Sequence, residues 1–425
     1  MKDIAEKSLF DIPGGWKTLL WILVILGIGM FIAGLMTGGE ESVVRTWQAF
    51  LINTVFWGGI AHAGVIFAVI WQITDAKWGR AFKRLAEACA GFLPISFLMF
   101  MVVFFGSHVL YEWTHTPFLH HGEAVKQGWL NLPFFISRNV FWLLLIYGIS
   151  YWFIKTSIKP DIALARRLIG SDWGGKFADW VLEDYGEHET EVIRLEKLSR
   201  KIAPVLALIY AIGGSFLAWD FVMTLDQTWF STLFGVFVMI GNMHAFLGLM
   251  LVVAVTVRKK FGIEEYISIN RLHDLAKMTF AFSLLWTYMG YSQYIVIWYA
   301  DLPEETPYLI IRSMNAPWNT LFLVIILWVF VSVFIGLLPR TLCRIPNYIR
   351  LMGIWVMLGQ LLSVYIMVVP SLQHDGHYHI FMGLHELLIT LGFVGAFFLC
   401  YLAFLGKLPI LPISDKHLCR TWHGH

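Results

Sequence analysis

Residues 47–73 read WQAFLINTVFWGGIAHAGVIFAVIWQI, an apolar run without a single charged side chain. A helix needs about 20 mostly apolar residues to cross a hydrocarbon core of roughly 30 Å, so this run is long enough to span a membrane. Nine further stretches have the same character, and we expect helices because a backbone inside a bilayer must satisfy its own amides. The ten expected spans are 17–37, 47–73, 85–110, 134–155, 202–221, 230–257, 275–300, 317–338, 350–370 and 382–405.

The composition is that of a membrane protein. Hydrophobic residues make up 58% of the chain and charged residues 14%, whereas soluble domains carry about 25% charged residues. The four cysteines show no Cys-x-x-Cys spacing, so we expect no covalently bound haem or iron–sulfur cluster in this chain. The sequence also lacks a Walker loop, and we expect no nucleotide site and no nucleic-acid partner. We therefore predict an all-α polytopic membrane protein.

The loops between these spans alternate between basic and non-basic. Of the 31 Lys and Arg residues, only Arg45, Lys126, Arg138 and Arg312 fall on one side of the expected membrane. Cytoplasmic loops of membrane proteins are enriched in Lys and Arg, so the pattern predicts ten spans with both termini in the cytoplasm. The N-terminal residues lack the short apolar core of a signal peptide, and we expect the first helix to be retained.

One long polar region interrupts the spans. Residues 156–200 mix acids and bases with apolar residues at helical spacing, which predicts one or two amphipathic helices on the cytoplasmic surface; a solvated connector is the alternative. The expected regions are an N-terminal segment with the first helix (1–46), a first repeat with helices two to four (47–155), this cytoplasmic loop (156–200), helices five to nine with a second repeat (201–370), and an outer His-rich loop, helix ten and tail (371–425).

Two parts of the chain resemble each other. Residues 84–87 read RLAE and residues 271–274 read RLHD, each at the cytoplasmic start of a helix. An outer arginine, Arg138 or Arg312, then precedes the following span. The offset of four helices predicts a parallel internal repeat that builds two four-helix bundles, with the remaining helices peripheral. The alternative is that any helix start attracts arginine.

Several ionisable or polar residues lie within the expected spans or at their ends. Such residues are costly in a bilayer and usually face a bundle interior. Carboxylates and histidines in these positions can relay protons, because burial and neighbouring charges shift their pKa values towards neutral. Helix capping or contact with lipid headgroups is the alternative for those at span ends. The candidate proton-path residues are His62, Glu87, Asp220, Asn242, His244, Arg271, His273 and Asp274.

Other polar residues are candidates for a quinone site or a metal site. A histidine or carboxylate beside a tyrosine can hold a quinone oxygen, and the candidates are His108, Tyr111, Glu112, Tyr291 and Gln293. One haem held by His62 and His244 is conceivable, but we expect none because no helix carries two histidines at suitable spacing. The outer loop contains His374, His377 and His379, for which we favour a pH-sensitive or interfacial role over metal binding.

The sequence resembles a known family in three stretches. Residues 219–235 read WDFVMTLDQTWFSTLFG, residues 273–306 contain HDLAK, SQY and IWYADLPEET, and residues 75–79 read DAKWG. These stretches are similar to the NrfD/polysulfide-reductase-like membrane subunits of bacterial alternative complex III, above all to the shorter of its two such subunits. The resemblance covers helices two to eight.

The resemblance implies a subunit of a quinol:cytochrome c oxidoreductase complex, or one with another electron acceptor, in the bacterial cytoplasmic membrane. Implied partners are a second, larger NrfD-like subunit, multihaem and monohaem cytochromes c, an iron–sulfur and molybdopterin-oxidoreductase-like subunit, lipids and a terminal oxidase. Haem c and iron–sulfur clusters would reside in the partners, with quinol or menaquinol as the diffusible cofactor. This subunit would have a structural or proton-conducting role.

Two alternatives remain open at this point. The chain could be the quinol-binding catalytic subunit of the same complex, using the outer residues named above. It could also be a secondary transporter with a parallel repeat, which discontinuous helices would favour. Gly213-Gly214 is the only nearby break of that kind in the sequence.

Overall fold

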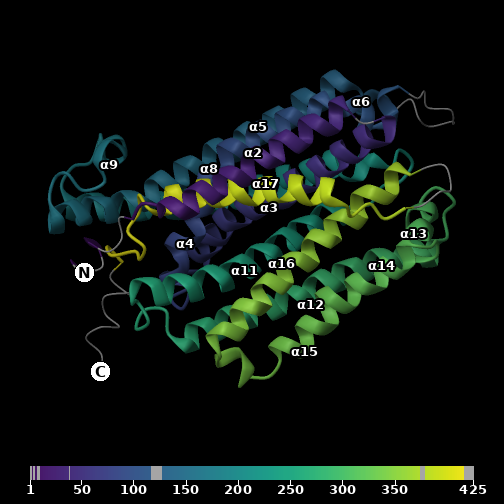
Figure 1. Cartoon of the computed structure of the whole chain (residues 1–425). Helices are drawn as coiled ribbons and strands as arrows, with labels where there is room; N and C mark the ends of the chain where they lie inside the picture. The colour runs from purple at the N-terminus through teal and green to yellow at the C-terminus, as the bar shows by residue number, and fades with distance from the viewer. Residues whose placement is uncertain are drawn as a thin grey trace.

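The computed structural model describes residues 2, 5–6, 10–37, 39–115, 127–373 and 379–415. Within these residues the chain forms helices and no strands, and long helices run side by side along one direction (Figure 1). The start of α2 (Gly14–Met36) and the end of α17 (Leu384–Leu405) lie at one end of this assembly, which we call the terminal end, together with α9 (Gly175–Leu182) (Figure 1). The opposite, distal end carries α6 (Ser107–Leu110) and α13 (Thr306–Ser313) (Figure 1).

Nine helical segments in the described residues are long and apolar enough to cross a membrane. This confirms the prediction of an all-α polytopic membrane protein. The segments are α2 (Gly14–Met36), α3 (Glu40–Thr74), Arg80–Phe105 with α4 (Lys83–Glu87) and α5 (Leu93–Phe105), α8 (Leu132–Ile169), α10 (His188–Phe221) with the short turn to Leu225, α11 (Phe234–Phe261), Trp318–Leu337 with α14 (Trp318–Ile325) and α15 (Val333–Leu337), α16 (Pro346–Val368) with the turn to Leu372, and α17 (Leu384–Leu405).

The expected seventh span, 275–300, differs from the others. It lies in α12 (Ile269–Ala300), whose 32 residues are ample in length. Its composition nevertheless falls short of the apolar character of the nine segments, because polar residues such as Gln293 and several tyrosines interrupt it. By length and composition together the described residues thus provide nine spans where the sequence predicts ten.

Helix α3 is the centre of the molecule. Every residue from Thr46 to Val69 is buried, and the neighbours of α3 are α10, α11, α17 and the segment Arg80–Phe105. The reason is visible in the sequence, since a helix that is apolar on all sides is stable only when surrounded by other helices. A polar side chain on α3, such as His62, therefore faces protein rather than lipid.

Helices α2 and α17 pack closely on one another at the side of α3. At their crossing a methyl group on Gly27 would lie 2.6 Å from the Cα atom of Gly392, so only glycine fits there. Small residues at such crossings let two membrane helices approach backbone to backbone. The outer side of α2 exposes large apolar residues, among them Trp21 and Ile25, as expected for a surface in contact with lipid.

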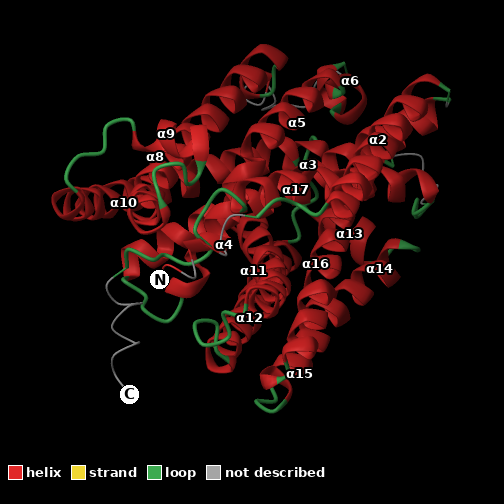
Figure 2. Cartoon of the chain, turned by 60° about the vertical axis from the view of Figure 1, so that its left-hand side comes forward, coloured by secondary structure: helices red, strands yellow, loops and turns green. Residues whose placement is uncertain are grey.

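Residues 156–200, for which the sequence predicts a cytoplasmic connection with one or two amphipathic helices, are largely helical. Helix α8 continues to Ile169 and α10 begins at His188. The connection between them is therefore short, and it contains α9. The polar residues that suggested a loop are accommodated in α8 because they find partners inside the protein. Figure 2 shows α8, α9 and α10 together at one side of the terminal end.

Candidate functional site

Helix α8 carries a row of buried polar side chains along one face. Asn139, Tyr147, Ser150, Ser157 and Asp161 are all buried, and their spacing places them within about a quarter of the helix circumference, given 3.6 residues per turn. The 22 residue steps from Asn139 to Asp161 correspond to about 33 Å of helix, which matches a hydrocarbon core of roughly 30 Å. We call this row the polar face of α8.

The terminal end of the polar face holds a buried charged cluster, which we call the terminal cluster. Arg84 is 2% exposed, and Glu87 and Asp161 are fully buried. The Nη2 atom of Arg84 lies 2.6 Å from Oδ2 of Asp161, and Arg84 also pairs with Glu87. Ser157 donates to Glu87 Oε1 at 2.6 Å. One guanidinium contacts two carboxyl groups, and the nearby Lys83 adds a second positive charge, so the cluster is a compact group of buried, mutually compensating charges.

The C-terminal segment covers this cluster. The backbone N–H of Ser414 donates to Asp161 Oδ1 at 2.8 Å, and its hydroxyl donates to the same oxygen. Asp415 pairs with Arg80 at the surface. Leu408, which starts this stretch, is fully buried. The segment after α17 therefore covers the buried carboxyl group of Asp161 at the terminal end of α8.

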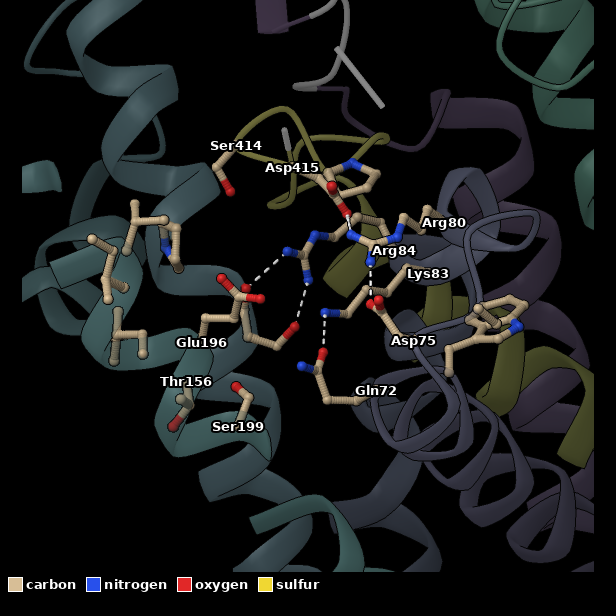
Figure 3. A pocket seen from close by; sticks show the side chains of 18 residues that line it. Gln72, Asp75, Arg80, Lys83, Arg84, Thr156, Glu196, Ser199, Ser414 and Asp415 are labelled. Carbon is tan, nitrogen blue, oxygen red and sulfur yellow. Dashed lines mark hydrogen bonds and ion pairs between the residues drawn. The ribbon is translucent and has the colours of Figure 1, made fainter. Parts of the chain in front are cut away.

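A cavity of about 180 Å³ adjoins the terminal cluster. Arg84 and Ser157 of the cluster line it, so the cavity gives the cluster a route towards the terminal end. Lys83 lies there with its amino group 3.3 Å from Gln72 Oε1. Figure 3 shows Lys83, Arg80 and Arg84 on one side of this cavity and Thr156, Glu196 and Ser199 on the other.

The middle of the polar face meets His62 of α3. The imidazole of His62 lies 4.8 Å from the ring of Tyr147 and 5.9 Å from the ring of Tyr210, measured between centroids. Ser96 and Tyr147 share a hydrogen bond between their hydroxyl groups. Among the described residues, Nε2 of His62 has no hydrogen-bond partner. A buried polar atom of this kind needs a partner, and water is the usual one.

Space for such water exists beside His62. A cavity of about 40 Å³ is lined by His62, Tyr210 and Asn242. This volume exceeds the roughly 15 Å³ that one water molecule needs. Asn242 of α11 reaches this cavity because Gly59 of α3 leaves room for it. A methyl group at Gly59 would lie 2.3 Å from the Asn242 side chain. His62 and Asn242, two candidates from the sequence, therefore meet at one small cavity. We call His62, Asn242 and Tyr147 the middle cluster.

The distal end of the polar face holds a second buried ion pair, the distal cluster. Asp220 is fully buried and accepts two hydrogen bonds of 2.7 Å from Nε and Nη2 of Arg138. Asn139 donates to Oδ2 of Asp220 at 2.9 Å. The guanidinium of Arg138 also lies over the ring of Trp129, 4.0 Å from its centroid. This bidentate geometry is the strongest form of a charged hydrogen bond.

The three clusters are separated by apolar turns of α8. Leu143 and Ile146 lie between the distal and middle clusters, and Phe153 and Ile154 lie between the middle and terminal clusters. All four side chains are buried. The polar face therefore consists of three separate polar clusters along the helix rather than one continuous chain of hydrogen bonds.

The remaining candidates for a proton path lie elsewhere. His244 is buried in α11, and its Nδ1 atom lies 2.8 Å from Nε2 of Gln360 in α16. Arg271, His273 and Asp274 lie at the start of α12, where Asp274 forms an exposed ion pair of 3.0 Å with Lys277. The structure thus brings Glu87, His62, Asn242 and Asp220 to the polar face of α8, and it leaves the other four apart from it.

The five candidate quinone residues do not form one site. Tyr291 and Gln293 line a cavity of about 760 Å³ between α12, α13, α14 and α16, and His108, Tyr111 and Glu112 do not. Tyr111 is buried and donates to the carbonyl of Phe221 at 3.1 Å. His108 is exposed on α6. The residues that sequence reasoning grouped at the outer face are therefore divided between two locations.

Most of the outer histidine loop falls outside the described residues. His374 and His377 lie outside the described residues, and His379 is exposed. In the described parts of the chain, no three His, Cys, Asp or Glu side chains gather closely enough to hold a metal ion.

Sequence reasoning missed the partners that complete the charged clusters. Arg84 and Arg138 were noted only as markers of the repeat, and Asp161 was assigned to a loop. The signal that could have found them is the recurrence of polar residues at steps of three, four, seven or eight positions from Asn139 to Asp161, which indicates one helix face.

A comparison of the chain with protein-family models finds no match, and a comparison with curated proteins finds none either.

Proposed function

We propose that this chain is an integral membrane subunit of a quinol-oxidising respiratory complex and that it conducts protons along the polar face of α8. The observation that carries the proposal is the placement of three buried polar clusters along about 33 Å of one helix. Ionisable groups in a membrane interior are rare, and they often serve ion or proton pathways.

Each cluster has groups suited to a step of proton transfer. In the terminal cluster the carboxyl groups of Glu87 and Asp161 share the guanidinium of Arg84, and they would be the groups that exchange a proton. In the middle cluster His62 can accept a proton at one ring nitrogen and release it from the other. Water in the cavity beside it would extend its reach. In the distal cluster Asp220 ends the row at the opposite side of the membrane.

The assignment to a quinol:cytochrome c oxidoreductase complex, or one with another acceptor, rests on the sequence resemblance described above. It proposes a larger NrfD-like subunit, cytochromes c and an iron–sulfur subunit as partners. Quinol would be oxidised elsewhere in the complex, and the haem and iron–sulfur clusters would belong to the partners. The packing of this chain is compatible with a role that needs no redox group of its own.

The proposal includes the full topology in a bacterial cytoplasmic membrane. With α12 as the tenth span, α3, Arg80–Phe105, α8 and α10 would form a first four-helix bundle, and α11, α12, α14–α15 and α16 a second. In support, α10 packs on α8 and α3, while α11 packs on α12 and α16. Helices α2 and α17 would be peripheral. The concentration of Lys and Arg at the terminal end supports a cytoplasmic position for both termini.

The alternatives are less well supported by the geometry. A quinol-binding catalytic role would use the outer residues His108, Tyr111, Glu112 and Asp220. Asp220 is paired with Arg138. Tyr111 donates to the carbonyl of Phe221, and none of the four lines the cavity of about 760 Å³. A transporter of the parallel-repeat class would favour helices broken near the membrane centre. Helices α3, α11 and α12 instead run without interruption through their apolar segments.

The test is proton stoichiometry of the purified complex in sealed vesicles, driven by a reduced quinol with cytochrome c as acceptor. We expect Glu87→Gln and Asp161→Asn to lower the number of protons moved per electron while quinol oxidation continues in uncoupled vesicles. Asp179→Asn is the matched control, because Asp179 is an exposed carboxylate on α9 outside the clusters. Wild-type stoichiometry in both cluster variants would overturn the proton-conducting role.

Membership in the complex has its own test. Purification of the chain from native membranes in mild detergent, with a redox difference spectrum and subunit identification, should yield c-type haem and an iron–sulfur subunit alongside it. A chain that purifies alone and colourless would overturn this part of the proposal and leave the question of proton conduction separate.

A further inference from the structure

Arg312 is a buried cation with an unusual set of partners. Its side chain is 4% exposed, and it lies at the distal end in α13. It donates to the carbonyl groups of Ile366, Tyr308 and Met367 at 2.9, 2.9 and 3.1 Å and to the Ser371 hydroxyl at 2.7 Å. All four acceptors are neutral. Because a guanidinium has five N–H donors, these bonds leave one N–H on Nη1 for another partner.

The corresponding arginine of the first group of helices has a carboxylate. Arg138 lies near the start of α8 and pairs with Asp220 at the end of α10. Arg312 stands before the following helix α14 and bonds Ser371 at the end of the α16 segment. Serine therefore occupies the position where the first group has aspartate. Among the described residues, Asp226 is a carboxylate that interacts electrostatically with Arg312, but it forms no ion pair with Arg312 at contact distance.

This charge borders a large apolar cavity. Arg312 contributes to the wall of the 760 Å³ cavity between α12, α13, α14 and α16. Trp286 and Phe237 line its interior, and Gln293 and Ser363 add the few polar groups. The cavity thus combines a mainly aromatic and aliphatic wall with a positive charge at one place, the arrangement that an amphiphilic molecule with an anionic head would fit.

The cavity also meets the surface of the molecule that faces lipid. Tyr291 of α12 and Leu323 of α14 both line the cavity and are exposed, at 60% and 55%. Helices α12 and α14–α15 lie next to one another at the edge of the assembly (Figure 1). An acyl chain can therefore enter between them from the bilayer.

We propose that this cavity binds an anionic phospholipid, with the lipid phosphate on Arg312 and an acyl chain along the aromatic wall. A buried charge without a counterion in direct contact is unfavourable, and a phosphate would supply both that direct contact and an acceptor for the remaining N–H of Arg312. A neutral quinone would supply no such counterion. The inference is independent of the proton pathway, which lies in the other group of helices.

The experiment compares retention of two lipids by the full chain. The protein is purified in mild detergent, supplied with equal amounts of phosphatidylglycerol and phosphatidylcholine, and examined by native mass spectrometry. We expect wild type to retain one phosphatidylglycerol in preference to phosphatidylcholine. Ser371→Asp places a carboxylate beside Arg312, as Asp220 lies beside Arg138. This carboxylate would compete with the lipid phosphate, so we expect the preference for phosphatidylglycerol to fall about tenfold or more, the factor that a charged hydrogen bond contributes.

Further variants keep the test sharp. Thr37→Asp adds the same charge at the exposed distal end of α2, and it should leave the lipid preference unchanged. Arg312→Gln should abolish the preference, and Ser371→Asp remains decisive if that variant does not fold. Asp375 lies outside the described residues, and Asp375→Asn should not strengthen phosphatidylglycerol binding.

Three results would overturn the inference. The first is equal retention of phosphatidylcholine and phosphatidylglycerol by wild type. The second is a quinone retained in the cavity in place of phospholipid. The third is a preference that survives Ser371→Asp or rises in Asp375→Asn, since a carboxylate of this chain would then be the counterion of Arg312.

Discussion

The carboxyl group of Asp161 lies 2.6 Å from the guanidinium of Arg84, although 77 residues separate them in the sequence. Both side chains are buried, and Glu87 shares the same guanidinium. The pairing joins α8 to the helical segment that starts at Arg80, at the level where the C-terminal segment closes over them. It therefore fixes the terminal end of the first group of helices.

The charges of this cluster predict that replacing Arg84 destabilises the protein more than replacing Asp161. Arg84→Gln removes the guanidinium that contacts both buried carboxyl groups and leaves only the charge of Lys83 near them. We expect this variant to be destabilised by about 3–5 kcal/mol, as for other broken buried pairs. Asp161→Asn leaves Arg84 and Glu87 as a balanced pair, and we expect a clearly smaller effect. Thermal unfolding in detergent measures both. Equal destabilisation by the two variants would contradict this account of the cluster.

The distal pair predicts strong coupling between Arg138 and Asp220. Either Arg138→Met or Asp220→Leu alone leaves one buried charge, so each should destabilise the protein by about 3–5 kcal/mol. The double variant removes both charges and should be markedly less destabilised than the sum of the single variants. A double-mutant cycle of unfolding free energies measures this coupling, and additive effects would show that the pair is not a unit.

The contact of Gly59 with Asn242 predicts a second-site rescue. Gly59→Ala places a methyl group against the Asn242 side chain, and overpacking of this kind costs about 1–3 kcal/mol. Asn242→Ala removes the obstacle, so the double variant should regain much of the stability lost in Gly59→Ala. Unfolding temperature and yield report the result. Gly59→Ala with wild-type stability would show that α3 and α11 can move apart freely at this point.

Helix α12 predicts a topology that can be checked directly. If α12 crosses the membrane, Glu264→Cys before it and Glu304→Cys after it should be labelled by an impermeant maleimide from opposite sides. Both positions are exposed, and Cys89 and Cys343 are buried. Cys400 and Cys419 are replaced by serine to remove background labelling. Labelling of both from the same side would exclude α12 as a span.

The candidate site shows how far sequence reasoning reaches in a membrane protein. Glu87, His62 and Asp220 attracted attention because ionisable residues are costly within apolar runs. Their partners Arg84, Arg138 and Asp161 did not, because a residue near a span end reads equally well as a surface residue. Span 134–155 also ended too early in the sequence interpretation, since nothing in 156–169 reveals that buried partners will satisfy its polar groups.

The sequence by itself determined that this chain is a bundle of long apolar helices. Only helices of that length satisfy their backbone hydrogen bonds across a bilayer, so apolar runs are sufficient to identify them. The tertiary structure decided which polar groups meet, because this depends on the rotation and depth of each helix against its neighbours. Two of the buried arginines illustrate the difference: Arg138 meets the carboxylate of Asp220 and Arg312 meets the hydroxyl of Ser371, and only the packing of α10 and α16 distinguishes them.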